Sequence, residues 1–464
     1  MADGLEDGPG GLYARLMPAL PSQLAAYEPP GSLVAVLQTL RNHGHEAFVV
    51  GGAVRDLLCG IAPSELDLAT DAPAERVAAL FARVIPTGIA HGTVTVLHDG
   101  ASYEVTTYRG DAPVIEEDLA RRDFTVNAMA FDPLEGRFLD LHGGRADLSN
   151  RLIRAVGEAH DRFGDDPLRV MRACRFASRM GFRIERKTRR AIPAHLQAFK
   201  KVAPERIRDE LSKLLVGDHP RYGMELLRRT GLLALILPEL LEGLGMRQNR
   251  WHRYDVYHHV LHAVNEADPK LAVRLATLLH DVDKPTTAAP SAKVEGETTF
   301  YSHEVSGADR ARAICERLRF SNRLSAKVSL LVREHQFVYS EAWSDGAVRR
   351  MLARVGEENF DDLIAVRKAD LLGRAVAVEE GLDNLRALED RVRGLLASRP
   401  ALTTRDLAIG GRDVIEALSI PPSPVIGAAL DHLLNEVIES PERNTREELQ
   451  AILASWWKDH RPEG

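Results

Sequence analysis

An apolar run from Phe48 to Val50 near the start of the chain predicts a buried strand. Gly51 and Gly52 end this run, and the pattern of a short helix follows at once, from Ala53 to Leu58. A glycine pair between a strand and a helix lets backbone N–H groups approach an anion without obstruction by a Cβ atom. The segment therefore predicts a turn that can bind a phosphate group.

The flanking sequence alternates between helix and strand patterns. Apolar residues at helical spacing predict a helix over residues 33–42, capped by Ser32, and a second helix over residues 74–81. Alternating apolar and polar residues predict strands over residues 84–88, 91–96 and 103–109. We therefore expect an α+β head over residues 31–150, preceded by a flexible leader over residues 1–30.

Beyond residue 150, apolar residues recur mainly at helical spacing. This pattern predicts an all-helical neck over residues 151–250, a histidine-rich domain over 251–375 and a helical C-terminal body and tail over 376–464. The predicted fold class is α+β, with a mixed sheet in the head and helices in the remainder.

Composition narrows the class of protein. The 464 residues carry a formal net charge of −7, so contacts with RNA must come from local basic patches. The longest apolar stretch, residues 232–241, is too short to cross a bilayer, and the N-terminus lacks the pattern of a signal peptide. The three cysteines are widely spaced, which favours reduced thiols. We therefore expect a cytoplasmic protein that does not bind a membrane.

Two carboxylates follow the glycine turn. Glu65 and Asp67 are two residues apart in a predicted strand, so both side chains should point to the same face of the sheet. Carboxylates beside a phosphate-binding turn are suited to Mg²⁺ that bridges a nucleoside triphosphate. A solvated acidic strand end is the alternative, but the ordered combination of strand, glycine pair, helix and carboxylates within residues 48–70 argues against it.

Arginines gather in two later segments. Arg121 and Arg122 precede Asp123 in the string RRDFTVNAMA, and a cationic pair suits a triphosphate. Further along, helical spacing places four arginines on one side of a helix: Arg169, Arg172, Arg175 and Arg179. A solvated basic face is the alternative, but this density of arginine in an acidic protein favours contacts with phosphate groups of a nucleotide or RNA.

Asp166 and Arg169 are three residues apart and can meet the same edge of a base. A carboxylate only accepts hydrogen bonds, and a guanidinium only donates them. Cytosine and adenine present an amino donor beside a ring-nitrogen acceptor, whereas uracil and guanine present the opposite order and would leave buried groups unpaired. These side chains can therefore select C and A without a nucleic-acid template; an ordinary helix cap with an ion pair is the alternative.

Histidines and carboxylates recur through residues 251–375. Neutral imidazoles and carboxylates are good ligands for first-row divalent metals. One helical histidine is more often a buried core residue than a ligand, but the adjacent pair His280-Asp281, with histidines on both sides, is much less often accidental. The pattern predicts a divalent transition metal in this domain.

The segments 48–70, 121–130, 165–169 and 204–211 together resemble the class II tRNA nucleotidyltransferase and bacterial poly(A) polymerase family, whose head belongs to the polymerase-β superfamily. The resemblance implies Mg²⁺-dependent catalysis by Glu65, Asp67 and a third carboxylate on a later strand, Glu104. It also implies a set of nucleotide-binding residues: Gly51, Gly52, Arg55, Arg122, Asp123, Asn127, Asp166, Arg169, Arg172 and Arg175. Glu65 and Asp165 replace the family's usual aspartate and glutamate.

The order of histidines and aspartates resembles an HD-type phosphohydrolase domain, which some members of the same family carry. Asp283 stands where the common form of that domain has glycine. The resemblance implies four core metal ligands and two candidates for a second metal: His259, His280, Asp281 and Asp370, with His303 and His335.

These resemblances predict template-independent transfer of nucleotides to the 3′ end of tRNA, with release of pyrophosphate and no binding of DNA. The connection from Arg109 to Arg121 is short compared with full CCA-adding members, and a short connection resembles CC-adding members. A mobile segment there could shift the base-reading pair from cytosine to the larger adenine. We therefore expect addition of CC from CTP, with the terminal A left to a separate A-adding enzyme of the same cell.

Four alternatives stay open from the sequence. The chain could be a full CCA-adding enzyme that also uses ATP, or a poly(A) polymerase with the same head motifs. The HD-like domain could carry the main activity as a phosphohydrolase. The head could also be inactive and act only as an RNA-binding module.

Overall fold

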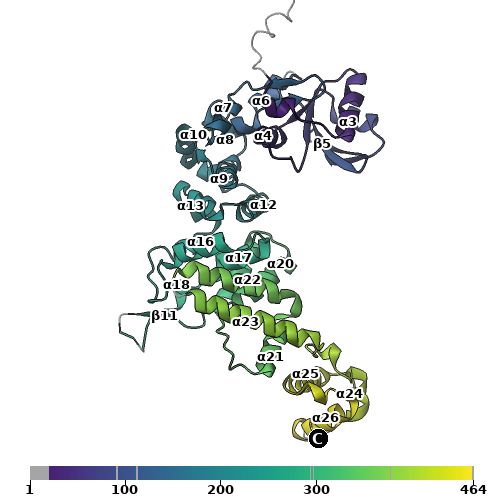
Figure 1. Cartoon of the computed structure of the whole chain (residues 1–464), viewed down its shortest axis with the longest axis vertical. Helices are drawn as coiled ribbons and strands as arrows, with labels where there is room; N and C mark the ends of the chain where they lie inside the picture. Colours follow the sequence, from purple (N-terminus) through teal and green to yellow (C-terminus); the bar gives the residue numbers. More distant parts are fainter. Residues whose placement is uncertain are drawn as a thin grey trace, which may run out of the picture. The chain divides into compact units, whose positions relative to one another are not determined.

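The computed structural model describes residues 20–89, 92–110, 113–292, 294–295, 297–376 and 378–461. The chain divides into two compact units, drawn in Figure 1: the first comprises residues 1–214 and 222–235, and the second comprises residues 215–221 and 236–464. Residues 1–19 of the expected leader, residue 91 of an expected strand and residues 111–112 of the connection lie outside the described residues. Within the described part of the chain, no helix combines the length and apolarity needed to cross a membrane.

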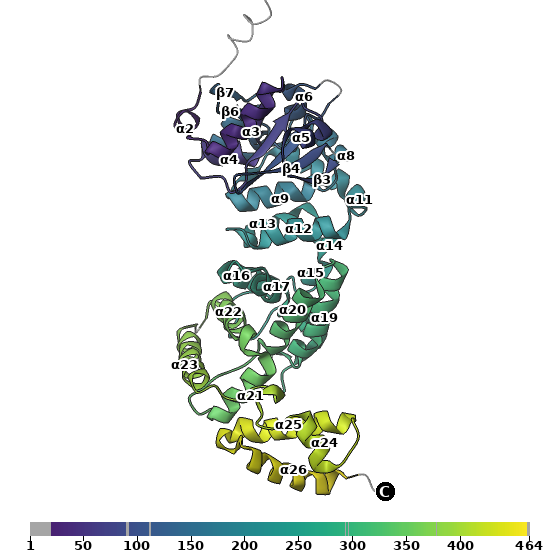
Figure 2. The same cartoon turned by 90° about the vertical axis from the view of Figure 1, so that its right-hand side faces the viewer.

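A seven-stranded mixed sheet forms the head of the first unit (Figure 2). Its strands are β1 (Ala47–Val50), β2 (Asp67–Thr70), β3 (Val84–Gly88), β4 (Thr93–His98), β5 (Ala101–Thr107), β6 (Ala130–Asp132) and β7 (Arg137–Leu139). The order across the sheet is β3-β4-β5-β2-β1-β6-β7. β2 and β5 run parallel, and the other neighbours pair antiparallel. The strand that carries Asp67 therefore lies at the centre of the sheet.

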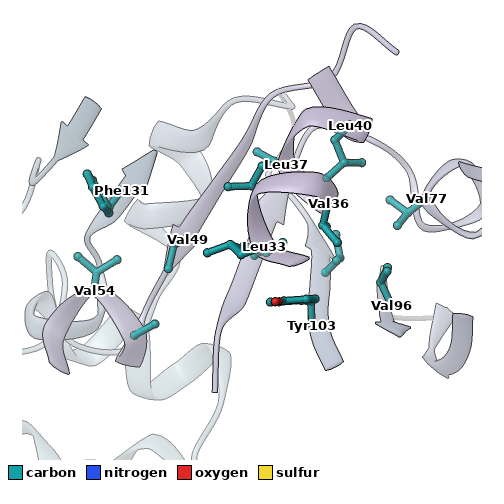
Figure 3. Close-up of a cluster of buried hydrophobic side chains, with 14 of the residues drawn as sticks. Leu33, Val36, Leu37, Leu40, Val49, Val54, Val77, Val96, Tyr103 and Phe131 are labelled. Atoms are coloured by element: carbon teal, nitrogen blue, oxygen red, sulfur yellow. The ribbon is translucent and has the colours of Figure 1, made fainter. Parts of the chain in front are cut away.

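Apolar residues on both faces of this sheet are buried, as the run at Phe48–Val50 predicts. On one face, Val49 packs in a cluster with α3 (Gly31–Asn42), α4 (Gly52–Leu58) and α5 (Ala74–Leu80). Figure 3 shows Leu33 and Leu37 of α3 in this cluster beside the sheet. On the other face, Phe48 and Val50 pack with Ile115 and Leu119 of α6 (Ile115–Ala120). The side chains alternate because successive residues of a strand face opposite ways.

Two expectations for the start of the chain need correction. Pro30 rather than Ser32 occupies the N-cap position of α3, and the Ser32 hydroxyl instead hydrogen-bonds the Tyr103 hydroxyl at 2.7 Å. Residues 20–30 are not a loose leader, because α2 (Ser22–Ala25) inserts Leu24 into the core of the head.

Helices dominate residues 144–236, most of which belong to the first unit. They are α7 (Gly144–Ser149), α8 (Ala159–Asp165), α9 (Arg169–Met180), α10 (Arg186–Ala191), α11 (Leu196–Phe199), α12 (Pro204–Leu215), α13 (Pro220–Thr230) and α14 (Leu233–Ile236). One short parallel pair, β8 (Leu152–Ile153) with β9 (Arg183–Ile184), interrupts them. The neck is therefore mostly, but not entirely, helical.

In the part of it that the structure describes, the second unit is built from helices and one short hairpin. Its helices are α15 (Pro238–Leu241), α16 (Val256–Glu266), α17 (Leu271–Leu279), α18 (Lys284–Thr287), α19 (His303–Arg317), α20 (Asn322–Glu334), α21 (Asp345–Val355), α22 (Glu357–Arg374), α23 (Val378–Ala397), α24 (Gly411–Leu418), α25 (Pro424–Glu439) and α26 (Arg446–His460). β10 (Ala288–Pro290) and β11 (Thr298–Phe300) form the hairpin. α16, α17, α20 and α22 pack together, while α24, α25 and α26 enclose a separate apolar cluster.

Candidate functional site

The three predicted catalytic carboxylates line one cavity of about 540 Å³ in the first unit. Asp67 is the first residue of β2, and the parallel register of β2 with β5 places it directly beside Glu104. Glu65 does not share that strand, because β2 begins only at Asp67. The expected strand position of Glu65 is therefore wrong, although its side chain lines the same cavity from the preceding loop.

The electrostatics of these carboxylates favour a cation. Burial, together with Glu104 and Glu65, raises the pKa of Asp67 to about 6, while Arg122 acts in the opposite direction. Mg²⁺ is usually held by one or two carboxylates together with phosphate oxygens of the substrate, rather than by a cage of protein ligands. The residues present therefore fit a divalent metal whose coordination a nucleoside triphosphate completes.

The glycine turn brings the backbone close to an arginine of the cavity. Gly51 has a φ of 68°, and a Cβ atom there would lie 3.1 Å from Nη1 of Arg122. The guanidinium of Arg122 is held by buried Asp118, with Nε 2.9 Å from Oδ2. Gly52 and Arg55 line the same cavity, and Arg55 donates to Oδ1 of Asn127 at 2.7 Å. A side chain at position 51 would be strained and would crowd Arg122.

A buried network connects the head to helices α9 and α12. Asn127 donates to Oδ1 of Asp123 at 3.2 Å, and Arg172 of α9 donates to Oδ2 at 2.6 Å. Glu210 of α12 accepts from Arg175 at 2.5 Å and lies 3.4 Å from Arg172. Burial raises the pKa of Asp123, but Arg172 and the other hydrogen-bond donors outweigh it and lower the pKa overall. Asp123 therefore stays charged and holds Arg172 at the wall of the cavity.

The two predicted base-reading side chains line this cavity but do not pair with each other. Asp166 follows α8, and its Oδ2 accepts from Nη2 of Arg206 at 2.7 Å. Arg169 opens α9, and its guanidinium donates to the backbone carbonyls of Arg162 at 3.2 Å and Arg121 at 3.0 Å. Both side chains thus have partners that the sequence reasoning did not foresee.

The second unit contains a separate cluster of histidines and aspartates in one buried group. His259 Nε2 lies 3.2 Å from Oδ1 of Asp370 and 3.4 Å from Oδ2 of Asp281. His280 Nε2 lies 3.2 Å from Oδ2 of Asp281, and His303 Nε2 lies 3.2 Å from Oδ1. The structure therefore gathers residues of α16, α19 and α22, and the segment after α17, around one carboxylate.

The histidine rings are oriented by the backbone so that their Nε2 atoms face the cluster. The Nδ1 atoms of His280, His303 and His335 each lie 2.7 Å from a carbonyl oxygen three residues earlier. This is the usual support of a metal-binding histidine. The carboxylate of Asp281 and the Nε2 atom of His303 are buried in the cluster, and Oδ2 of Asp281 also lies 2.7 Å from Nζ of Lys284. Imidazole nitrogens and a carboxylate that converge in this way fit a metal ion.

Two further residues change the sequence-based description of this cluster. His252 has a nitrogen within 4.8 Å of ligand atoms of His259 and Asp370, although the sequence reasoning overlooked it in the loop before α16. Burial, more than the charge of Lys284, lowers its pKa to about 2, so the ring is neutral. Asp283 hydrogen-bonds Ser306 and Arg310. Among the described residues, it is not one of those whose ligand atoms converge in the cluster, so it does not replace a metal ligand.

Comparison with known proteins identifies the relatives of both units. Residues 47–154 match the "Poly A polymerase head domain", residues 181–244 match the "Probable RNA and SrmB- binding site of polymerase A", and residues 298–453 match the tRNA nucleotidyltransferase domain 2 family. The chain is 34% identical to the CCA-adding enzyme of Lactobacillus helveticus, over 87% of this chain and 90% of that protein. It is 32% identical to the CCA-adding enzyme of Geobacillus stearothermophilus, over 90% and 95%.

A solved structure supports the same relationship. The Bacillus stearothermophilus CCA-adding enzyme in complex with CTP superimposes with a TM-score of 0.71 at 30% identity, covering 94% of this chain and all of that one. The α+β fold class expected from the sequence, with a sheet in the head and a mostly helical remainder, is confirmed.

These relatives overturn the expectation of CC-only addition, because they are full CCA-adding enzymes. That expectation depended on one connection being short. Its described part includes α6, which buries Ile115 and Leu119 against the sheet. The separate A-adding enzyme was a consequence of the same expectation and is withdrawn with it.

The matches span both units and nearly the whole chain. Enzymes of this class use a divalent metal ion, in agreement with the carboxylates around Asp67. The chain is therefore a nucleotidyltransferase, and it belongs to the class II family of the CCA-adding enzymes.

Proposed function

We propose that this protein adds C, C and A to the 3′ end of tRNA from CTP and ATP, with release of pyrophosphate. One observation carries the proposal: a single cavity is lined by the glycine turn, by Asp67 with its neighbouring carboxylates, and by the pair Asp166 and Arg169. The cavity therefore combines groups suited to a triphosphate, to a metal and to a base edge. The CCA-adding activity of relatives at 34% and 32% identity supports the choice of substrates.

Each group has a separate role in the proposed reaction. Glu65, Asp67 and Glu104 would hold Mg²⁺, which lowers the pKa of the attacking 3′-hydroxyl and stabilises charge on the transferred phosphate. Arg122 would contact the triphosphate above the glycine turn. Asp166 would accept the amino hydrogen of cytosine or adenine while Arg169 donates to the ring nitrogen. A base with the opposite order of donor and acceptor would leave these groups unpaired and would be rejected.

We expect the purified chain to extend a tRNA that lacks its tail to a product ending in CCA when CTP and ATP are both supplied. With CTP alone, the product should end in CC, because the next base requires ATP. Sequencing of the products measures both results. A homopolymeric A tail would favour a poly(A) polymerase instead, and products that stay at CC with both nucleotides present would contradict the proposal.

We also propose that the histidine cluster of the second unit binds a divalent transition metal. The observation that favours it is the convergence of His259, His280 and Asp281 within 4.8 Å, with Asp281, His303 and His335 forming an adjoining group. Asp281 would bridge the two groups. The cluster lines a cavity of about 450 Å³ together with Lys284 and Arg374, and this cavity would admit a small phosphate ester for hydrolysis.

Wild-type protein should take up Co²⁺ or Mn²⁺ after treatment with a chelator, and a His280→Ala variant should lose most of this uptake. The metal content measured by mass spectrometry tests the site without any substrate. His258→Ala is the matched control, because His258 adjoins His259 on α16 but pairs with Asp255 instead. Equal metal content in all three proteins would reject the site. Nucleotide incorporation that survives His280→Ala would show that hydrolysis is not the main activity.

A further inference from the structure

Arg206 has a conspicuous position beside the proposed base-reading pair. It lies in the first turns of α12, and its guanidinium reaches Asp166 across 40 residues of sequence. The Arg206 side chain is 53% exposed, whereas that of Asp166 is 26% exposed. An exposed arginine that reaches a partly buried carboxylate contributes little to stability on average. This contact therefore calls for an explanation other than folding.

Two hydrogen bonds fix the Asp166 carboxylate, one to each oxygen. Oδ1 accepts from the backbone N–H of Leu168 at 3.1 Å, and Oδ2 accepts from Arg206 at 2.7 Å. The terminal torsion of an aspartate is otherwise broad, so one bond alone would let the carboxylate rotate. A carboxylate has about four lone-pair positions, so two remain for a base after both bonds are made. Arg206 thus orients the acceptor without using it up.

Arg169 is held away from Asp166 in a similar manner. Its guanidinium donates to the carbonyls of Arg162 and Arg121, although its position three residues after Asp166 would permit a direct ion pair. Such a pair would satisfy donor and acceptor with each other and would leave neither for a base. The structure keeps the two side chains separate by giving each a different partner.

We propose that Arg206 is a specificity-determining positioning residue: it holds Asp166 apart from Arg169, so that both remain available to one base edge. This inference rests on the proposed function, because it assumes that Asp166 and Arg169 read the base. Arg206 itself is not among the residues that line the cavity, so it acts through Asp166 rather than on the nucleotide.

Arg206→Ala should lower the preference for CTP over UTP, measured as the ratio of kcat/KM values on a tail-less tRNA, by about tenfold, the usual worth of one charge-assisted hydrogen bond. The change should fall mainly on KM for the nucleotide, because Arg206 does not touch the reacting atoms. Arg206→Lys should recover much of the preference, since an ammonium can make the same single bond. Arg208→Ala is the matched control, because Arg208 pairs with Asp209 on the same helix.

A double-mutant cycle separates this role from a general effect on α12. Once Asp166 has been replaced by alanine, Arg206→Ala should cause no further loss of preference, because the two residues act through one contact. An additive effect of the two substitutions would overturn the inference. So would an unchanged nucleotide preference in Arg206→Ala or an equal loss of preference in Arg208→Ala. An Arg206→Lys variant with as little preference as Arg206→Ala would also overturn it.

Measuring the affinities for CTP and UTP in the absence of tRNA distinguishes a failure of the inference from a failure of the proposed function. If wild-type protein incorporates no nucleotide yet binds CTP in preference to UTP, and Arg206→Ala loses that preference, the proposed function fails and the positioning role stands. If wild-type protein incorporates C and A but Arg206→Ala binds with unchanged preference, the inference fails and the proposed function stands.

Discussion

Replacing Asp67 with asparagine should lower the rate of nucleotide incorporation by about a thousandfold and leave tRNA affinity nearly unchanged. A metal ion contributes several kcal/mol of transition-state stabilisation, and each 1.36 kcal/mol corresponds to a factor of ten in rate. Asn keeps the shape of the side chain at the start of β2 but removes the charge beside Glu104. Single-turnover incorporation of CTP measures the rate, and a binding titration with tail-less tRNA measures the affinity.

Asp99→Asn is the matched control for this experiment. This substitution removes one negative charge from the same head, as Asp67→Asn does. The side chain of Asp99, however, is 78% exposed in the turn between β4 and β5. Its variant should incorporate nucleotide at the wild-type rate. If Asp67→Asn retained more than a tenth of the wild-type rate, Asp67 would not be the main metal ligand, and the catalytic assignment of the whole cavity would have to be revised.

The elements of the head that are determined by a short run of neighbouring residues could be predicted from the sequence. The run Phe48–Val50, the glycine pair and the helix after it form β1, the turn and α4 close to the expected positions. Only the parallel pairing of β2 with β5 brings Asp67 beside Glu104, but strand alternation indicates which face of the sheet a strand residue points to. Local patterns contain this information because neighbours in the chain determine which face is apolar.

Errors arose where a prediction needed the exact boundary or the function of a connection. Glu65 lies before β2, although its spacing from Asp67 suits a strand, because a single acidic residue cannot indicate where pairing begins. The segment from Arg109 to Arg121 suggested CC addition through its length alone. Length does not reveal that α6 packs into the core of the head, and the relatives that share this architecture are CCA-adding enzymes.

Partners far apart in the sequence could not be identified without the fold. Arg206 meets Asp166 only because α12 lies beside the start of α9, and His252 joins the histidine cluster from a loop without any helical pattern. Glu210 belongs to the same group of long-range partners. Periodicity places it on the buried side of α12, but a buried glutamate gives no indication of which arginine it will meet.

Replacing Glu210 with alanine should destabilise the first unit by about 3 kcal/mol, because Arg175 would stay charged and buried without the carboxylate that pairs with it. Glu210 and Arg175 are 4% and 5% exposed, and their contact is 2.5 Å long. For a unit of about 150–250 residues, this loss corresponds to a fall in Tm of roughly 6 °C or more. Calorimetry that resolves the transition of the first unit measures it, since a chain with two units need not unfold in one step.

The same change should also impair the site, because Glu210 supports the arginine that holds Asp123. Arg172 contacts both carboxylates, so the loss of Glu210 frees one side of its guanidinium and loosens the wall of the cavity. Glu205→Ala is the matched control, since Glu205 is exposed on the same helix. Glu210→Gln should be intermediate, because the amide keeps one acceptor for Arg175 but lacks the charge. A Tm for Glu210→Ala equal to that of Glu205→Ala would mean that the buried arginines do not depend on this carboxylate, and α12 would then support the site by packing alone.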